Sequence, residues 1–325
     1  MQAATEHPIA VHRRREHEYE SPVNDRRLQR LVEDGSQVRI AAGSYVPAAE
    51  WNALTPLQRH LTRVIEIADR TRSPQVLTHA AAAAVWGLDR IGPWPDLVEV
   101  RIPSASGGRS SGGIRRRALG YDGVDVLPWR GHLVTSPAQT AIDLAAEARF
   151  TDGVIAMDQA RWSRRDGGAL TDRIRIDDVL SGQFRRGLGR VQRVIEFSTE
   201  LSDSVRESQS RVLIERLGFP VPVLQRTFRL PALGDVRTDF WFDDFDHIGE
   251  FDGTGKYLDP TLLAGRSPGE ALLAEKDRGD ALRRIVRRVS RWRTPALRDP
   301  RLLYDILTGD GLPSRLPRPR VGAQW

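Results

Sequence analysis

Three carboxylates lie close together in the C-terminal third of the chain, in the segments VRTDFWF and HIGEFDGTGKY. They belong to Asp239, Glu250 and Asp252. Both segments are rich in β-branched, aromatic and aliphatic residues, and the intervening Asp243-Asp244-Phe245-Asp246 suits a turn. A turn centred on these four residues puts Asp239 opposite Glu250, with Asp252 further along the same face. The sequence therefore predicts a β-hairpin that brings three like charges together.

Like charges that face each other across paired strands destabilise a sheet, and a divalent cation with oxygen ligands neutralises them. We therefore expect Asp239, Glu250 and Asp252 to bind Mg²⁺ or Mn²⁺, which activates water and stabilises charge during phosphodiester cleavage. Lys256 and Lys276 are the only lysines in the chain. They follow the acids, where an ammonium group can neutralise a phosphate or orient the attacking water. The alternative is a solvated turn in which the acids pair with neighbouring arginines.

The composition favours a cytoplasmic protein with an anionic partner. The chain has 325 residues, enough for two or three domains, and 40% of them are hydrophobic, which fits a globular protein. It contains no cysteine, which excludes disulfides, thiol catalysis and cysteine-ligated zinc and fits a reducing compartment. No apolar run has the length of a membrane span, and residues 1–20 lack the apolar region of a secretory signal. The net charge of +6 makes nucleic acid the first partner to consider. His79 and His132 have no ligand-spaced partner, so we expect packed or surface side chains.

Residues 1–50 have the pattern of a small DNA-binding unit. Two helices are predicted over residues 11–20 and 26–33, and residues 37–47 have the pattern of a two-stranded hairpin. A helix pair followed by a hairpin is the order of a winged helix-turn-helix. The predicted DNA contacts are arginines of the second helix and of the hairpin: Arg26, Arg27, Arg30 and Arg39. The alternative is an ordinary helical pair with a solvent-exposed arginine face.

The rest of the chain divides into four parts. Residues 51–145 mix predicted helices and strands, and residues 146–198 form an arginine-rich helical linker. Residues 199–312 begin with a helix that carries Glu207 in its first turn, and they continue in the order α-β-β-β-α-β. That order, with acids at strand ends, is the core of a restriction-endonuclease-like fold. Residues 313–325 are rich in proline and arginine, and we expect a disordered tail. The fold class is therefore predicted to be α/β, of the α+β kind.

Four stretches between residues 199 and 293 carry a resemblance to a known family: ESQSRVLIERLGFPVP, VRTDFWF, GEFDGTGKY and EKDRGDALRR. They resemble the very-short-patch-repair-like branch of the PD-(D/E)XK nuclease superfamily. The resemblance implies a nuclease in which Asp239 binds the metal and Glu250 is the acid of the E-x-K position. It also implies that Glu207 supports the metal through a water molecule.

The sequence departs from the superfamily pattern at the lysine expected two residues after Glu250. That position is Asp252, so the role of the lysine would pass to Lys276 or Lys256. The departure leaves the fold assignment in place and puts catalytic activity in doubt.

Three stretches of the first 145 residues resemble the actinobacterial AbiEi-like antitoxin module: RRLQRLVEDGSQVRIAAGSYVPAAEW, VLTHAAAAAVWGL and VTSPAQTAIDLA. The resemblance implies a winged helix-turn-helix followed by an α/β domain. In that family the pair binds promoter DNA and opposes a nucleotidyltransferase toxin, so DNA and such a toxin are the implied partners.

Two functions follow from these patterns, and the sequence leaves both open. The first is an enzyme, in which a DNA-binding N-terminal half delivers a Mg²⁺-dependent endonuclease to its target, as part of a toxin–antitoxin or phage-defence system. The second is a non-catalytic transcriptional regulator or antitoxin, in which the nuclease-like domain is degenerate and binds DNA or protein.

Overall fold

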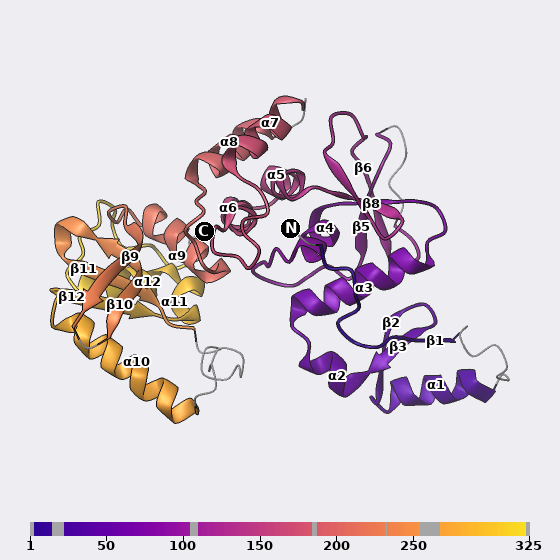
Figure 1. The fold of residues 1–325 in the computed structure, drawn as a ribbon, viewed down its shortest axis with the longest axis horizontal. Coiled ribbons are helices and arrows are strands. Elements are labelled where there is room, and N and C mark those ends of the chain that lie inside the picture. The colour runs from indigo at the N-terminus through magenta and orange to yellow at the C-terminus, as the bar shows by residue number, and fades with distance from the viewer. Residues whose placement is uncertain are drawn as a thin grey trace. The chain divides into compact units, whose positions relative to one another are not determined.

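A computed structural model of the protein describes residues 3–14, 23–104, 110–183, 187–231, 233–253 and 267–322. The chain divides into two compact units, Met1–Glu200 and Leu201–Trp325, close to the boundary predicted after residue 198. Helices and sheets occur in both units, which confirms the predicted α+β class (Figure 1). None of the helices within these ranges is long and apolar enough to cross a membrane.

Unit 1 begins with a three-stranded antiparallel sheet of order β1-β3-β2. Its strands are β1 (His12–Arg13), β2 (Gln37–Ala41) and β3 (Ser44–Pro47). The hairpin between β2 and β3 turns at Gly43, whose φ of +73° is a conformation that glycine adopts without strain. Helix α1 (Val23–Glu33) contacts β2.

The order of these first elements differs from the predicted helix, helix and hairpin. His12–Arg13 forms a strand, so the helix predicted over residues 11–20 is wrong at these positions, and residues 15–20 lie outside the described part of the chain. Arg13 is bound through its side chain to acids of a later helix, and this favours an extended backbone that pairs with β3. The described order is therefore strand, helix and hairpin.

Two helices follow the hairpin: α2 (Ala48–Ala53) and α3 (Pro56–Arg70). Thr55 and Gln58 form a capping box at the start of α3, which explains why the helix begins where it does. Trp51 of α2 packs with Ile40 and Val46 of the hairpin in a small core. This packing fixes the hairpin against the helices that follow it.

The second sheet of unit 1 has five strands in the order β6-β5-β4-β8-β7. The bounds are β4 (Val76–Leu77), β5 (Val98–Ile102), β6 (Ile114–Ala118), β7 (Val126–Trp129) and β8 (His132–Thr135). The pairs β4–β8 and β5–β6 are parallel, and the other two pairs are antiparallel. The alanine-rich helix α4 (His79–Trp86) is buried along its whole length and ends at Gly87, which has the left-handed conformation.

Four further helices complete unit 1: α5 (Pro137–Glu147), α6 (Phe150–Arg161), α7 (Arg173–Ser181) and α8 (Leu188–Phe197). Ser136 accepts a hydrogen bond from the backbone of Gln139 and so caps α5, and Pro137 occupies the first turn. Helix α5 contacts α4, α6, α7 and α8. The predicted arginine-rich linker is therefore packed onto the helical layer of unit 1.

His60 of α3 makes unit 1 sensitive to acid. Its ring is fully buried and stacks on Trp94, with 5.0 Å between ring centroids. Burial, with help from the Arg63 guanidinium, lowers the pKa of His60 to about 4. The unfolded chain binds this proton near pH 6.5, so the stabilisation is present above pH 6.5 and is lost as the pH falls towards 4.

We therefore expect His60→Phe, which keeps the stacking, to remove part of the loss of stability between pH 6.5 and pH 4. Protonation of His60 lowers the free energy of unfolding over this pH range by on the order of 2–3 kcal/mol. Urea denaturation at both pH values measures the difference between variant and parent, with the exposed His12→Phe as control. An identical pH dependence in His60→Phe and the parent would show that His60 is not the group responsible.

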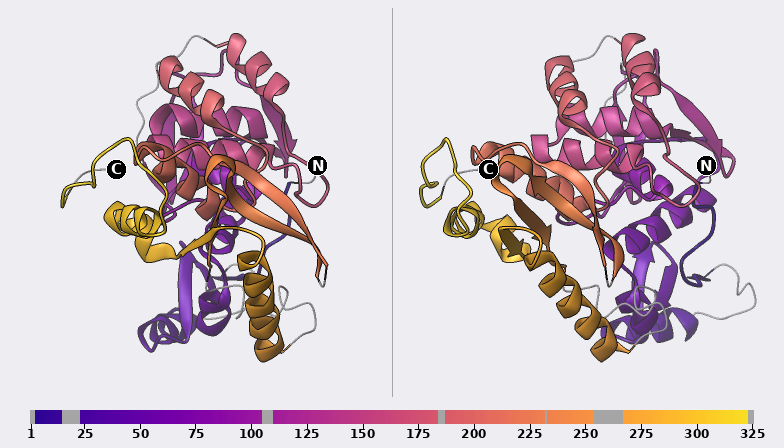
Figure 2. Two further views of the ribbon diagram at one scale, coloured as in Figure 1. Left: turned by 90° about the vertical axis from the view of Figure 1, so that its left-hand side faces the viewer. Right: turned by 60° about the vertical axis from the view of Figure 1, so that its left-hand side comes forward.

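Unit 2 contains a mixed sheet of order β12-β11-β10-β9 with helices on both faces (Figure 2). The elements are α9 (Val205–Arg216), β9 (Val223–Leu230), β10 (Gly234–Phe242), β11 (His247–Phe251), α10 (Pro268–Arg283), β12 (Arg288–Trp292), α11 (Thr294–Arg298) and α12 (Pro300–Gly309). From α9 to β12 they follow the predicted order α-β-β-β-α-β. Strands β11 and β12 are parallel, and the other pairs are antiparallel.

The two faces of this sheet have separate cores. Phe240, Phe242 and Trp292 pack against α9, α11 and α12, and Trp241 and Ile248 pack against α10. Gly249 lies beneath Trp292, since a Cβ at this position would come within 2.8 Å of the indole ring. The glycine of the GEFDG segment is therefore required by packing.

The alternation of side chains is interrupted in β9. Leu224 packs in the first core and Phe228 in the second, although residues four apart on a regular strand share a face. Between them Gln225 has a φ of +55°, and no pairing is made between Gln225 and Asp239. The interruption therefore lies beside the predicted site.

Residues 313–325 were expected to be a disordered tail; residues 313–322 have specific contacts over part of their length, and residues 323–325 lie outside the described part of the chain. The backbone N–H of Arg315 donates to the Gly218 carbonyl, and the Ser314 hydroxyl donates to the Leu217 carbonyl at 2.6 Å. Arg318 forms a two-point ion pair with Asp305, with both distances at 2.6 Å. Proline and arginine content alone predicted disorder, and these specific partners were not visible in it.

Candidate functional site

The predicted hairpin of unit 2 forms in the predicted register. Phe240 pairs with Gly249 and Trp241 with Ile248, which brings Asp239 level with Glu250. The turn contains a short 3-10 segment over Asp243–Phe245. The backbone therefore places the acids as expected, and their side-chain partners decide what the site can do.

Glu250 is 6% exposed and lies between two guanidinium groups. Arg278 of α10 donates to its Oε1 at 2.6 Å, and Arg291 of β12 lies 2.9 Å from its Oε2. Arg278 also donates to the carbonyl of Arg237, which ties α10 to β10. Each carboxylate oxygen of Glu250 thus has its own cation.

Asp252 and Asp239 also have separate partners. Arg293 makes two contacts with Oδ2 of Asp252, at 2.8 and 2.6 Å. The backbone N–H of Phe251 donates to Oδ2 of Asp239 at 2.9 Å. The three predicted metal ligands therefore do not share one counterion, because arginines or backbone groups contact each of them.

Glu207 is the acid that the structure brings close to Asp239. It accepts hydrogen bonds from the Asp203 backbone, the Ser204 hydroxyl and the Gln225 amide at 2.8 to 3.0 Å. Burial, with the neighbouring Asp239 carboxylate as the next cause, raises the pKa of Glu207 to about 7. Glu207 and Asp239 therefore influence each other, whereas the carboxylates of Glu250 and Asp252 contact arginines.

The residues do not fit a Mg²⁺ or Mn²⁺ site. In the ranges that the structure describes, no three acidic or histidine side chains are grouped so that they could hold a metal ion. The side-chain partners agree with this, since guanidinium groups contact both oxygens of Glu250 and Oδ2 of Asp252. Lys276 is exposed on α10, and Lys256 lies outside the described residues.

The predicted DNA contacts of unit 1 lie on α1 and β2. The side chains of Arg27, Arg30 and Arg39 are exposed, and Arg26 belongs to α1 but its side chain is not among those described. Because α1 contacts β2, these arginines belong to neighbouring elements.

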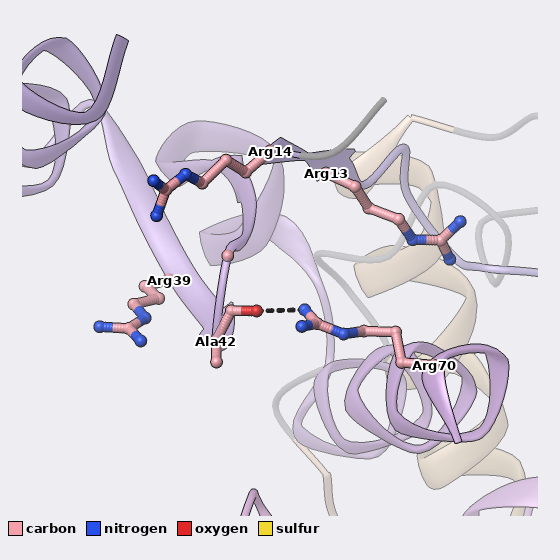
Figure 3. Close-up of a pocket in the computed structure, with 6 residues that line it drawn as sticks. Arg13, Arg14, Arg39, Ala42 and Arg70 are labelled. Carbon is pink, nitrogen blue, oxygen red and sulfur yellow. Dashed lines mark hydrogen bonds between the residues drawn. The ribbon is translucent and has the colours of Figure 1, made fainter. Parts of the chain in front are cut away.

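A pocket of about 720 Å³ lies beside the hairpin (Figure 3). We call it the arginine pocket; its lining residues are Arg13, Arg14, Arg39, Ala42, Gly43 and Arg70. Only Arg39 of this set was predicted. The other arginines come from β1, the residue after it and the last turn of α3, and only the folded chain brings these segments together.

A series of ionic contacts that was not predicted links the five-stranded sheet to α4 and α5. Glu99 accepts from the backbone of Ala80 and pairs with Arg117 at 2.7 Å, and Arg117 reaches Glu147, which lies 3.3 Å from the ring of His79. His79 has a φ of +50°, a strained value for this residue type. Of the two expectations for His79, a packed or a surface side chain, its 2% exposure shows the packed one.

His132 is likewise a packed residue: its Nδ1 accepts from the Gln75 backbone, and its Nε2 lies 3.0 Å from the Ala68 carbonyl.

No family model matches the chain. The chain is similar to two uncharacterized proteins of Mycobacterium tuberculosis, one from strain CDC 1551 / Oshkosh and one from strain ATCC 25618 / H37Rv. Each is 27% identical over 134 residues, which covers 41% of this chain and 48% of the relative. The chain thus spans about half the length of the curated relatives it matches.

Proposed function

We propose that the protein is a non-catalytic DNA-binding regulator whose C-terminal unit has the element order of a nuclease but a site neutralised by arginines. The observation that carries this proposal is the pair of guanidinium groups on Glu250, at 2.6 and 2.9 Å. A carboxylate with a guanidinium group on each oxygen already has its charge neutralised, so a divalent cation would have to compete with two fixed positive charges for it.

DNA binding is supported by the surface of unit 1. Exposed arginines on α1 and on the neighbouring hairpin, together with the arginine pocket, provide cations that contact phosphates. The net charge of +6 favours the approach to a polyanion. We also propose a nucleotidyltransferase toxin as a partner, because the first 145 residues resemble the AbiEi-like antitoxin module.

Footprinting of the DNA upstream of the coding sequence tests the regulator. We expect a protected site and raised expression from a reporter fused to this DNA when the protein is deleted. An unprotected upstream region with unchanged reporter expression would contradict the regulatory function.

The competing function is the metal-dependent endonuclease, and the observation that favours it is the closeness of Glu207 and Asp239. Because Glu250 and Asp252 are bound by arginines, we expect no nicking of supercoiled plasmid in Mg²⁺ or Mn²⁺ above the level of Asp239→Ala. Ion-dependent nicking by the parent that Asp239→Ala abolishes would refute the non-catalytic proposal.

A further inference from the structure

Four arginine side chains line the arginine pocket. Arg13 contacts Glu66 and Asp69 of α3, and Arg70 contacts Glu66. Asp69 is shared with a further arginine, Arg130, at 2.5 Å. A concave surface lined by several guanidinium groups attracts a compact anion.

Glu66 orients half of these arginines. Its carboxylate is fully buried and accepts from Nε of Arg13 at 2.9 Å and from the Ser44 hydroxyl at 2.5 Å. Arg70 approaches the same carboxylate at 3.7 Å and donates to Ser44 and to the Ala42 carbonyl. Arg13 and Arg70 therefore hold the hairpin onto α3 and form the rigid side of the pocket.

Arg14 and Arg39 form the other side. Figure 3 shows both side chains extending away from α3, whereas Arg13 lies on the α3 side of the hairpin. Both residues are exposed. The β2–β3 turn lies beside them: the backbone N–H of Arg14 donates to the Gly43 carbonyl at 3.0 Å, and Gly43 has no side chain. Two planar guanidinium groups beside a bare turn suit the tetrahedral oxygens of a phosphate.

We propose that the arginine pocket seats one phosphate of the DNA backbone, with Arg14 and Arg39 donating to its oxygens and Glu66 positioning the arginines behind them. The inference rests on the proposed DNA binding and adds the contact that the hairpin makes. A backbone phosphate fits better than a free phosphorylated molecule because α1, with exposed Arg27 and Arg30, contacts the strand that carries Arg39. A duplex lying on both elements gains contacts that a small anion does not.

The test is the salt dependence of DNA binding by the full chain, measured by fluorescence anisotropy with a labelled duplex. We expect Arg14→Met together with Arg39→Met to weaken binding about tenfold and to reduce the slope of log K against log salt by about one, the value for one lost phosphate contact. The control is Arg149→Met together with Arg283→Met, which removes the same charge from an exposed position just before α6 and from one at the end of α10. It should leave the slope unchanged.

Three results would overturn the inference, and they fail in distinguishable ways. Equal affinity and slope in the test and control variants would show that the pocket does not bind a DNA phosphate, and the proposed DNA binding would be unaffected. Pyrophosphate, measured at constant ionic strength, is the probe for a free anion. If the Arg14/Arg39 variant lost pyrophosphate binding while its duplex binding stayed unchanged, the pocket would be assigned to a free anion. Absence of duplex binding by the parent protein would contradict the proposed function itself.

Discussion

Glu250→Gln should lower the free energy of unfolding of the protein by about 2–4 kcal/mol. The substitution keeps the size of the side chain but removes the charge that Arg278 and Arg291 share. Two partly buried guanidinium groups are then left facing a neutral amide, and removing one member of a buried ionic cluster destabilises strongly. Urea denaturation followed by tryptophan fluorescence measures the change, since Trp241 and Trp292 lie in the two cores beside this site.

The sign of this effect separates the two interpretations of the acids. If Glu250 faced other carboxylates, removing its charge would relieve repulsion and stabilise the protein without metal. The exposed Asp244→Asn in the adjoining turn is the matched control and should change the free energy of unfolding by less than about 0.5 kcal/mol. If Glu250→Gln were more stable than the parent, the result would support the interpretation in which the carboxylates face one another and bind a cation.

Glu207→Gln should act in the opposite direction and stabilise the protein at pH 8. The pKa of Glu207 is raised from 4.5 to about 7, so the folded protein binds this proton more tightly than the unfolded chain does. Stability therefore rises as the pH falls from 7 towards 4.5, and above pH 7 the ionised group is unfavourable by on the order of 3 kcal/mol. The amide removes the charge beside Asp239 and keeps a carbonyl for the Asp203 N–H.

We expect a gain of about 1–3 kcal/mol at pH 8 and none at pH 4, where the parent side chain is already neutral. Thermal unfolding at the two pH values gives the comparison, and Glu215→Gln, an exposed residue on the same helix, is the control. A gain of equal size at both pH values would mean that the carboxylate of Glu207 is not the titrating group.

Local signals in the sequence were sufficient for most of the secondary structure. Ser136 and Ser204 cap their helices through hydrogen bonds to the third following residue, and Gly87 ends α4 in the left-handed conformation. The hairpin register of β10 and β11 followed from the turn and the spacing of strand residues. These features depend on neighbours within a few positions, so composition and pattern specify them.

The partners of the acids could not be predicted in the same way. Arg278 reaches Glu250 because α10 packs on one face of the sheet, and Arg291 reaches it because β12 pairs in parallel with β11. Both contacts depend on the register of elements that are distant in sequence. With 49 basic residues in the chain, the pattern gave no reason to choose these two.

The helix that was predicted over residues 11–20 also failed because of a contact between residues distant in sequence. His12–Arg13 has helical neighbours by pattern, yet it pairs with β3. The ion pairs of Arg13 with Glu66 and Asp69 link it to a helix more than fifty positions further along the chain. A contact of this range outweighs local preference, and the arginine pocket forms as its result.

The three-body arrangement at Glu250 also bears on how the domain can change through evolution. Its two cations come from a helix and from a strand, so no single codon change frees both oxygens. Replacing either arginine alone leaves the acid bound to the other arginine. Replacing the acid alone leaves two guanidinium groups without this acidic partner. A lineage in which this position came to bind a cation would have to pass through destabilised intermediates, so the two ion pairs restrict which single substitutions are tolerated here.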